Sequence, residues 1–289
     1  MRPEPGPVIR IPSDTPYNYA TIRITQSRMD KGLIAIPMAL EPWFPGHNGN
    51  IQVFLNDSPS SVAKRYSSHT SSTGECRIGG MKRWFEKNNI KSGDEVVLQL
   101  IDKERFVYRL IPERLFLLRI QDMQHNLDNS ETEEDASRIV SELGRWTASK
   151  RKETSFSEYY RLANASPSAD RGSRNLACRR GKERTTPHMR ALLRHLYEGH
   201  CQLCDFWFLK KDHEPYFEVH HLEASAGHHP KNLVVVCGNC HNQFEYADVQ
   251  QRFNSDGWLV NVCFNGRPFS VTNVLLATKI EAFYKEVFI

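Results

Sequence analysis

The sequence contains no hydrophobic run long enough to span a lipid bilayer. Its longest apolar stretches, such as residues 232–237, have the length of one β-strand. The N-terminal residues 1–14 are rich in proline and lack the apolar core of a secretory signal. An integral membrane protein is therefore excluded, and we expect a cytoplasmic protein in a reducing environment.

A strong excess of charge of one sign is also lacking, since 38 Lys and Arg residues stand against 34 Asp and Glu. The local distribution is more informative than the net charge of +4. Residues 145–194 contain 13 Lys and Arg but only 4 acidic residues, with clusters at 150–152 and 179–182. A segment of this kind is suited to contacts with DNA phosphates. The stretch 122–135 holds six acidic residues and no Lys or Arg, and we interpret it as a solvated face.

Cysteine is scarce, with 7 among 289 residues. Disulfides are rare in a reducing compartment, so regularly paired cysteines indicate metal ligands instead. Cys201 and Cys204 form one Cys-x2-Cys pair, and Cys237 and Cys240 form a second. Two such pairs supply the four thiolates of a tetrahedral zinc site. We predict a structural Zn²⁺ on these cysteines rather than four unrelated buried thiols.

Short apolar runs separated by turn residues dominate the chain from Tyr17 to Pro112. This spacing predicts several short strands in a small barrel or sandwich. One short helix is expected over residues 81–87, with Trp84 and Phe85 facing the core. The expected strands are residues 20–24, 32–37, 51–55, 95–100 and 106–110.

After residue 112 the apolar residues first recur at helical spacing, and farther along the chain both helices and strands are predicted. Residues 113–163 are predicted to be helical, and the Ser-, Arg- and Gly-rich residues 164–186 to be a linker. A helix should begin at Pro187 with Thr186 as its cap, because proline fits the first turn of a helix. The apolar face of this helix would carry Met189, Leu192, Leu193 and Leu196. Farther along, the sequence predicts a strand over residues 258–262 and a closing helix over residues 275–287.

Between the two cysteine pairs lies the segment Glu218-Val219-His220-His221-Leu222. We expect strands over 216–222 and 232–236, paired as a hairpin, and a helix after Cys240. That helix would place His241 and Glu245 one turn apart on a common face. A neutral histidine is a competent base near pH 7, and a single hard cation stabilises the charge that develops in phosphodiester hydrolysis.

The residues from Cys201 to His241 closely resemble the ββα-metal motif of HNH nucleases. The resemblance implies that His221 is the general base and that His220 and His241 ligate a catalytic Mg²⁺ or Mn²⁺. Asn232 stands where this family has an asparagine that ties the hairpin together. The products of such an enzyme would carry 5′-phosphate and 3′-hydroxyl ends.

Two assignments around this motif stay open. Many cysteine-bearing HNH nucleases have a second histidine four residues after the Cys-His pair, where this chain has Glu245. A carboxylate binds Mg²⁺ or Mn²⁺ well, so Glu245 is either a third ligand or an ordinary surface residue of the helix. We interpret His213, His228 and His229 as surface loop histidines that could lie near DNA.

The N-terminal part resembles the B3-like recognition domains of restriction endonucleases, which are open pseudobarrels that grip the DNA major groove between two arms. Here the arms would be residues 23–31 and 64–77. The DNA-contact candidates are Arg28, Lys31, Lys64, Arg65 and Arg77, unless these are solvated residues at strand ends. The matching segments are 32–37, 63–68, 75–78, 84–85 and 92–97.

The sequence thus predicts an α+β chain with two domains joined by a connector. Residues 1–112 would form the B3-like pseudobarrel, residues 113–186 a partly helical basic connector, and residues 187–289 the zinc-stapled HNH domain. The leading hypothesis is a type II restriction-like endonuclease of a bacterial or archaeal cell, associated with the nucleoid. Because two strands must be cut, we expect a homodimer on double-stranded DNA.

Two alternative functions remain. A modification-dependent restriction enzyme would have the same two domains but would cut DNA with altered cytosine. A DNA-binding regulator would keep the cysteines as a scaffold without nuclease activity. Intact His220, His221, Asn232 and His241 argue against the regulator, because a scaffold needs only the cysteines.

Overall fold

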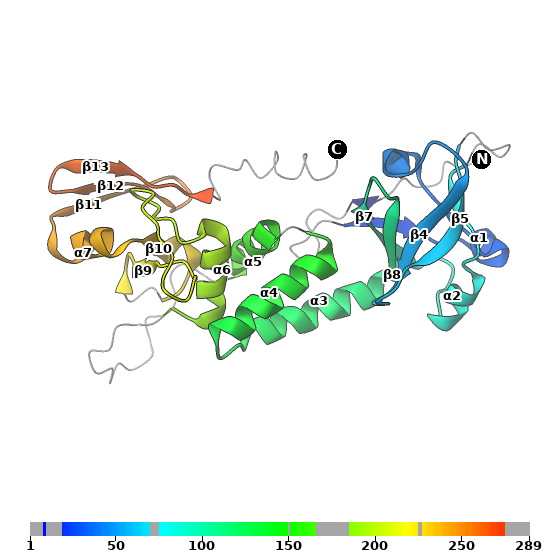
Figure 1. The fold of residues 1–289 in the computed structure, drawn as a ribbon, viewed down its shortest axis with the longest axis horizontal. Coiled ribbons are helices and arrows are strands. Elements are labelled where there is room, and N and C mark those ends of the chain that lie inside the picture. Colours follow the sequence, from blue (N-terminus) through cyan, green and yellow to red (C-terminus); the bar gives the residue numbers. More distant parts are fainter. Residues whose placement is uncertain are drawn as a thin grey trace. The chain divides into compact units, whose positions relative to one another are not determined.

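A computed structural model of the chain describes residues 8–9, 19–69, 75–149, 151–165, 185–224 and 227–274. The chain divides into two compact units, each considered by itself (Figure 1). The first comprises Met1–His125 and Arg145–Ala148, and the second comprises Asn126–Gly144 and Ser149–Ile289. Among the described residues, no helix combines the length and apolar character needed to cross a membrane.

The first unit is built on one eight-stranded sheet with the strand order β1-β2-β7-β8-β4-β5-β6-β3. Neighbouring strands are antiparallel except β4 and β8, which run parallel. Its strands are β1 (Val8–Ile9), β2 (Ala20–Arg23), β3 (Ile34–Ala35), β4 (Gly49–Leu55), β5 (Val62–Ser67), β6 (Arg77–Ile78), β7 (Glu95–Asp102) and β8 (Val107–Pro112). The short helical elements are α1 (Gln26–Lys31), η1 (Met38–Trp43) and α2 (Lys82–Lys87).

This sheet encloses a single hydrophobic core. Ile22 on β2 and Ile34 on β3 belong to the same buried cluster, although these strands lie near opposite ends of the strand order. The sheet must therefore curl around the core into a barrel-like shape. Trp84 and Phe85 of α2 are buried in that core, as the sequence predicted. The mixed α+β class and the barrel-like sheet are thus confirmed.

Helices follow the barrel, as expected for residues 113–163. They are α3 (Glu113–Asp128), α4 (Glu133–Thr147) and α5 (Arg151–Ala165). The division between the units falls within α3, and residues 145–148 at the end of α4 pack with the first unit. There Trp146 stacks on Phe116, with ring centroids 6.4 Å apart, and accepts a hydrogen bond from Gln99 at its carbonyl.

The acidic residues of the stretch 122–135 are exposed, as predicted, except for Glu133, which is half-buried. Asp128 accepts a hydrogen bond from Arg161 at 2.8 Å. Glu133, whose side chain is only 19% exposed, forms ion pairs with Arg190 at 3.0 Å and with Arg194. Asp128 and Glu133 thus neutralise arginines of the basic segment 145–194. These partners are distant in the sequence, so the pairing cannot be predicted from the acidic stretch itself.

Helix α6 (Pro187–Tyr197) begins at the predicted residue, with Thr186 at its N-cap position. The predicted apolar face is buried, and it packs with α5 and with the strand that carries the histidine pair. Within this basic segment Lys152 pairs with Glu198 at 3.1 Å. The cluster 179–182, most of the predicted linker and the predicted closing helix at 275–287 lie outside the described residues.

A hairpin followed by a helix occupies the predicted position beyond α6. Strands β9 (Glu218–His221) and β10 (Leu233–Val236) are antiparallel, with His221 opposite Leu233 and Glu218 opposite Val236. A short helical turn, η3 (Pro230–Asn232), precedes β10, and α7 (Gly238–Tyr246) follows it. A three-stranded sheet comes next, formed by β11 (Val249–Phe253), β12 (Leu259–Phe264) and β13 (Arg267–Ser270). Of this sheet the sequence predicted only the middle strand.

Candidate metal centre

The four cysteines of the two Cys-x2-Cys pairs meet in space. Their sulfur atoms all lie within 4.8 Å of one another. The Sγ atoms of Cys204 and Cys237 are 3.8 Å apart, and those of Cys204 and Cys240 are 3.7 Å apart. Four sulfurs about 2.3 Å from a central zinc at tetrahedral vertices would be about 3.8 Å apart. The cluster could therefore hold a structural metal such as zinc without rearrangement.

Local hydrogen bonds bring the two cysteine pairs together. The Cys201 N–H donates to the carbonyl of Phe206 at 3.1 Å, which closes the first turn. Gln202 then ties this turn to the hairpin, because its Oε1 accepts from Val235 N–H at 2.7 Å. Cys237 ends the hairpin and is the N-cap of α7, and its sulfur accepts from Cys240 N–H. The hairpin and α7 thus deliver the second pair of thiols to the first.

The electrostatics of the thiols also favour a bound cation. A hydrogen bond from Cys240 lowers the pKa of the Cys201 thiol to about 4. The same contact raises the pKa of Cys240, and burial raises the pKa of Cys204. One thiolate therefore forms readily while its neighbours resist ionisation, since several negative charges so close together repel. A divalent cation removes this conflict, because metal-bound thiols are deprotonated.

A second group of ligand atoms lies on β9 and α7. His220, His241 and Glu245 each offer an atom within 4.8 Å of the others. The His220 ring stacks on Phe244 of α7, with centroids 4.0 Å apart and an interplanar angle of 15°. Burial, together with the charges of His241 and His221, lowers the pKa of His220 to about 4. The imidazole is therefore neutral at pH 7, as a metal ligand must be.

Glu218 is a participant to which the sequence analysis gave no role. Its carboxylate accepts a hydrogen bond from Nδ1–H of His241 and another from the Tyr216 hydroxyl. The contact leaves Nε2 of His241 available as the ligand atom and fixes the orientation of the ring. Strand alternation could have identified it, because Glu218 and His220 are two residues apart and share one face of β9.

His221 is not one of the three clustered ligands. Successive strand residues point to opposite faces, so His221 lies on the other face of β9 from His220. Its Nε2 is 3.0 Å from Nδ1 of His228. His228 lies in the loop, as expected, and contacts His221. The expectation of a surface loop position is wrong for His229, because its side chain is buried and bonds Ala163 O at 3.0 Å and Lys231 N at 3.1 Å.

Asn232 closes the loop between the two strands of the hairpin. Its Oδ1 accepts from Glu223 N–H at 2.7 Å, and its Nδ2 donates to the carbonyls of Glu223 and Gly227, both at 2.8 Å. The side chain is buried, so each of these bonds is shielded from water. Asn232 thereby fixes the part of the loop that leads to His228 and does not itself contact the ligand group in these bonds.

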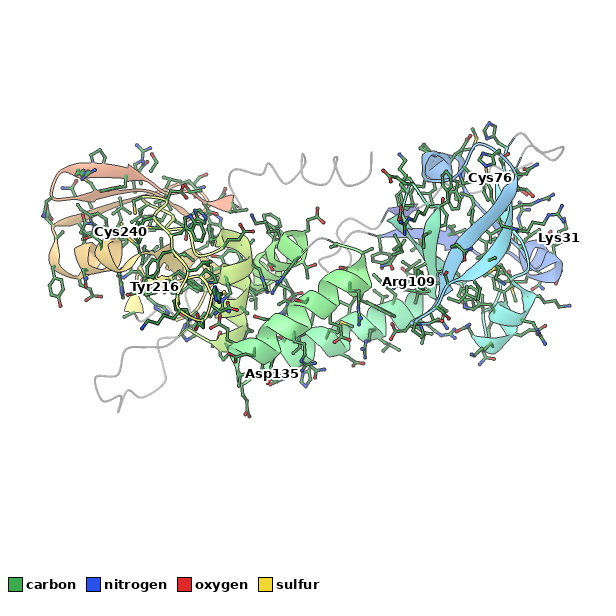
Figure 2. The ribbon with its side chains drawn as sticks, in the orientation of Figure 1. Lys31, Cys76, Arg109, Asp135, Tyr216 and Cys240 are labelled. Carbon is green, nitrogen blue, oxygen red and sulfur yellow. The ribbon has the colours of Figure 1, made fainter. Side chains whose placement is uncertain are left out.

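The DNA-contact candidates of the first unit fall into two groups. Arg28 is held by Glu75, to which its Nη1 donates at 2.8 Å, and Lys64 donates to the carbonyl of Gly80 at 2.7 Å. Arg77 is half-buried on β6. Lys31 at the end of α1 and Arg65 on β5 are exposed, and Figure 2 shows Lys31 projecting from the ribbon. Burial lowers the pKa of Lys64.

Comparison with known proteins gives little guidance. No protein-family model matches the sequence, and no curated protein matches it. Among solved structures the chain aligns with "Arabidopsis FUS3-DNA complex" at 12% identity, over 32% of this chain and 92% of that chain. The TM-score of 0.27 is too low to support a statement about fold or function. The residues of the site itself must therefore carry the functional proposal.

Proposed function

We propose that the chain is a metal-dependent DNA endonuclease whose second unit cleaves and whose first unit recognises DNA. One observation carries the proposal: β9 and α7 bring His220, His241 and Glu245 together, and α7 with its N-cap also supplies Cys240 and Cys237 to the four-cysteine cluster. This is the arrangement expected of a zinc-stapled HNH nuclease. The cysteines would brace the hairpin against α7, and the histidines and the glutamate would hold Mg²⁺ or Mn²⁺.

Each side chain has a distinct task in this proposal. His220, His241 and Glu245 would hold a divalent cation, which would supply positive charge to the phosphate under attack and to the leaving 3′-oxygen. His221 removes a proton from the attacking water, a step that suits a neutral imidazole. His228, 3.0 Å from His221, holds the ring of the base in place. Glu218 orients His241 in the same way through Nδ1.

Recognition is assigned to the barrel-like first unit. Lys31 and Arg65 are exposed and able to reach phosphates or base edges. Arg28, Lys64 and Arg77 would have to exchange intramolecular contacts or partial burial for DNA, so Lys31 and Arg65 are the better candidates. If Lys31 or Arg65 contacts a phosphate, its replacement by glutamine would weaken binding to all DNA sequences alike. If it contacts a base edge, the replacement would reduce the preference for one sequence.

The decisive experiment is cleavage of plasmid and phage DNA with Mg²⁺ or Mn²⁺ by the wild type and by His221→Ala. Loss of a general base lowers the rate by about 10²- to 10⁴-fold, so the discrete fragments of the wild type should disappear in this variant. His213→Ala is the matched control, because His213 is an exposed loop histidine. It should cleave like the wild type.

The same assay separates the alternatives. Cleavage of unmethylated DNA supports a conventional restriction-type enzyme, whereas cleavage confined to methylated DNA supports the modification-dependent type. DNA binding without cleavage on every substrate and metal would overturn the nuclease proposal and leave a DNA-binding protein. Sedimentation with and without a palindromic duplex tests the proposed homodimer.

A further inference from the structure

Four consecutive large apolar residues stand exposed just after the first cysteine pair. Phe206 is 55% exposed, Trp207 47%, Phe208 42% and Leu209 49%. Single exposed apolar side chains are common, but a contiguous patch usually marks a binding surface. We call residues 206–209, together with Tyr216, the aromatic patch.

The aromatic patch is held in a defined shape. Phe208 stacks on Tyr216 with ring centroids 4.7 Å apart and an interplanar angle of 20°, and Phe206 is tilted against Phe208 at 5.9 Å. The backbone is fixed as well, because Tyr216 N–H donates to the carbonyl of Phe208 at 3.0 Å. The rings are therefore presented in place before any ligand arrives, which reduces the entropy lost on binding.

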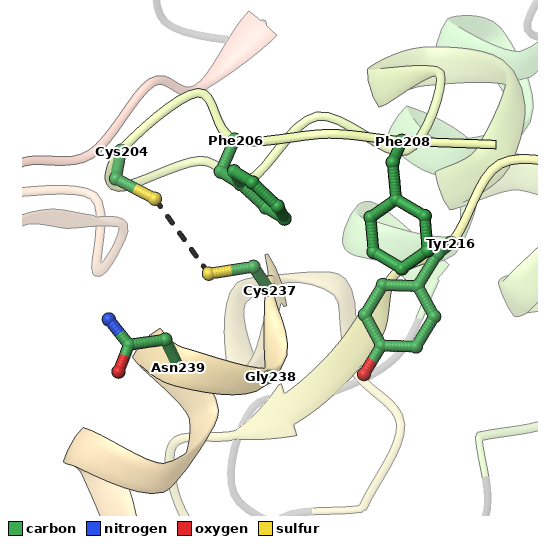
Figure 3. Close-up of a pocket in the computed structure, with 7 residues that line it drawn as sticks. All are labelled: Cys204, Phe206, Phe208, Tyr216, Cys237, Gly238 and Asn239. Atoms are coloured by element: carbon green, nitrogen blue, oxygen red, sulfur yellow. Dashed lines mark hydrogen bonds between the residues drawn. The ribbon is translucent and has the colours of Figure 1, made fainter.

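An open pocket of about 470 Å³ lies between the aromatic patch and α7. Figure 3 shows Phe206, Phe208 and Tyr216 along one side, with Gly238 and Asn239 at the start of α7 opposite them. The remaining lining residues are Cys204 and Cys237 of the cysteine cluster. The pocket thus has aromatic faces on one wall, and an exposed side-chain amide on the other.

Positive charge is available on the same loop and at the wall formed by α7. None of the described residues that line it is acidic. The acids of the same loop are engaged elsewhere: Asp205 bonds His200 at 2.8 Å, and Glu214 bonds Arg194 at 2.7 Å. Lys211 is exposed and has no ion pair within the described part of the chain. The nine-residue helix α7 also directs its positive end toward this wall.

The pocket is connected to the second ligand group through a short chain of contacts. Tyr216 belongs to the aromatic patch, and its hydroxyl donates to Glu218. The other oxygen of Glu218 accepts from His241, one of the three clustered ligands. A molecule in the pocket would therefore be separated from the proposed metal ligands by a single hydrogen-bonded residue, Glu218.

We propose that the aromatic patch binds an unpaired nucleobase of the DNA strand, stacked on Phe206, with its phosphate near Lys211. This inference rests on the proposed action on DNA and identifies the preferred substrate as DNA with a bulged, gapped or single-stranded base. A nucleobase fits the pocket because it offers a flat face to the rings and a polar edge to Asn239. Every base has such a face, so the contact carries little sequence preference.

The test measures binding separately from cleavage, with the full chain and Ca²⁺ in place of Mg²⁺. The probes are a duplex with one bulged 2-aminopurine and the fully paired duplex. The wild type should bind the bulged duplex more tightly and quench its fluorescence. Because base–aromatic stacking is strong, Phe206→Ala should weaken binding to the bulged duplex by about tenfold and leave the paired duplex unaffected.

Two further variants distinguish stacking from apolar contact or misfolding. Phe206→Leu keeps an apolar side chain without a ring and should behave like Phe206→Ala, whereas Phe206→Trp should keep the preference for the bulge. Phe253→Ala is the matched control, because Phe253 is 46% exposed on β11, outside the patch. It should bind both duplexes like the wild type.

The outcomes separate this inference from the proposed function. Equal affinity of the wild type for both duplexes, or an unchanged preference in Phe206→Leu, overturns the base site even if the enzyme cleaves DNA. Sedimentation could also show that Phe206→Ala has another oligomeric state than the wild type while its DNA affinity is unchanged. The aromatic patch would then be a contact between two copies of the chain, and this result would overturn the inference too. If the bulge preference is found but no cleavage occurs, the base site stands and the nuclease proposal fails.

Discussion

His195 shows how one buried residue makes stability depend on pH. It lies on the buried face of α6, and its Nε2 accepts a hydrogen bond from Arg151 Nε at 3.2 Å. Burial, with the charges of Arg151 and Arg194, lowers its pKa from 6.5 to about 4. Between these values the unfolded chain binds a proton that the folded protein does not. The free energy of unfolding should therefore fall as the pH drops from 6.5 toward 4, by up to about 3 kcal/mol.

The measurement is urea unfolding of the wild type and of His195→Gln at pH 8 and pH 5. Glutamine keeps an acceptor for Arg151 but does not titrate, so the wild type should lose more stability than the variant on acidification. Other groups that titrate in this range contribute equally to both proteins and cancel in the difference. His213→Gln, an exposed site, should lose as much as the wild type. An equal loss in His195→Gln would contradict the prediction.

Glu218 is the second residue with a measurable effect, because in the proposed metal site it would act on the metal through His241. Glu218→Gln should weaken Mn²⁺ binding to the zinc-loaded protein by about 10- to 100-fold, as loss of a hydrogen-bonded carboxylate behind a ligating histidine usually does. Calorimetric titration with Mn²⁺ measures the change. Tyr216→Phe, which removes only the hydroxyl bonded to Glu218, should weaken binding less. Equal affinities in all three proteins would show that His241 needs no orientation.

Among the elements, the turn from α6 to the first cysteine pair depends on Gly199. Gly199 has φ +83°, and a Cβ there would lie 2.5 Å from Cβ of Pro215. Gly266, in the β12–β13 turn, has φ +80° but open space around it. Both alanine variants should lose about 1–2 kcal/mol from the left-handed backbone. Gly199→Ala should lose at least about 1 kcal/mol more, since Pro215 must move.

Denaturant midpoints of the two variants, compared with the wild type, check this prediction. The matched backbone angles mean that the difference between Gly199→Ala and Gly266→Ala reports the overlap with Pro215 alone. If the two midpoints coincide, the turn that carries Cys201 and Cys204 can shift at little cost. Its position is then not fixed by the packing of Gly199 against Pro215.

Elements with a strong local signal were predictable from the sequence. Thr186 and Pro187 set the start of α6, and the apolar strands of the hairpin were expected close to β9 and β10. The short strands were harder. β6 is only two residues long, and most of β11 is exposed, so neither strand shows the alternation of buried and exposed residues that marks a strand in a sequence.

Contacts between distant residues were the part that the sequence could not supply. The ion pair of Glu133 with Arg190 and the contact of His221 with His228 depend on helix and loop packing. The sequence predicted His220 and His241 as ligands and left Glu245 open between a third ligand and a surface residue. The structure brings ligand atoms of all three within 4.8 Å of one another. The aromatic patch was missed, although its four consecutive apolar residues beside a metal turn were visible in the sequence.

At the scale of the whole molecule, the two units should respond differently to loss of metal. Three of the four clustered cysteines, Cys201, Cys237 and Cys240, are packed within a hydrophobic cluster of the second unit, together with Val234 and Phe264. The first unit has its own core without these cysteines. Structural zinc contributes about 10–16 kcal/mol to small zinc domains, which is comparable to the whole stability of a typical protein of 5–15 kcal/mol. Chelation should therefore unfold the metal-bearing part and leave the barrel folded.

Differential scanning calorimetry with and without a chelator measures this effect. We expect one transition to move to lower temperature or vanish while the transition of the first unit stays unchanged. Cys204→Ser, which removes an exposed member of the cluster, should reproduce the effect without chelator. Cys263→Ser, on β12 and outside the cluster, should not. A scan that the chelator leaves unaltered would mean that the four thiols hold no structural metal, because a contribution of this size cannot be lost without destabilising the unit that contains it.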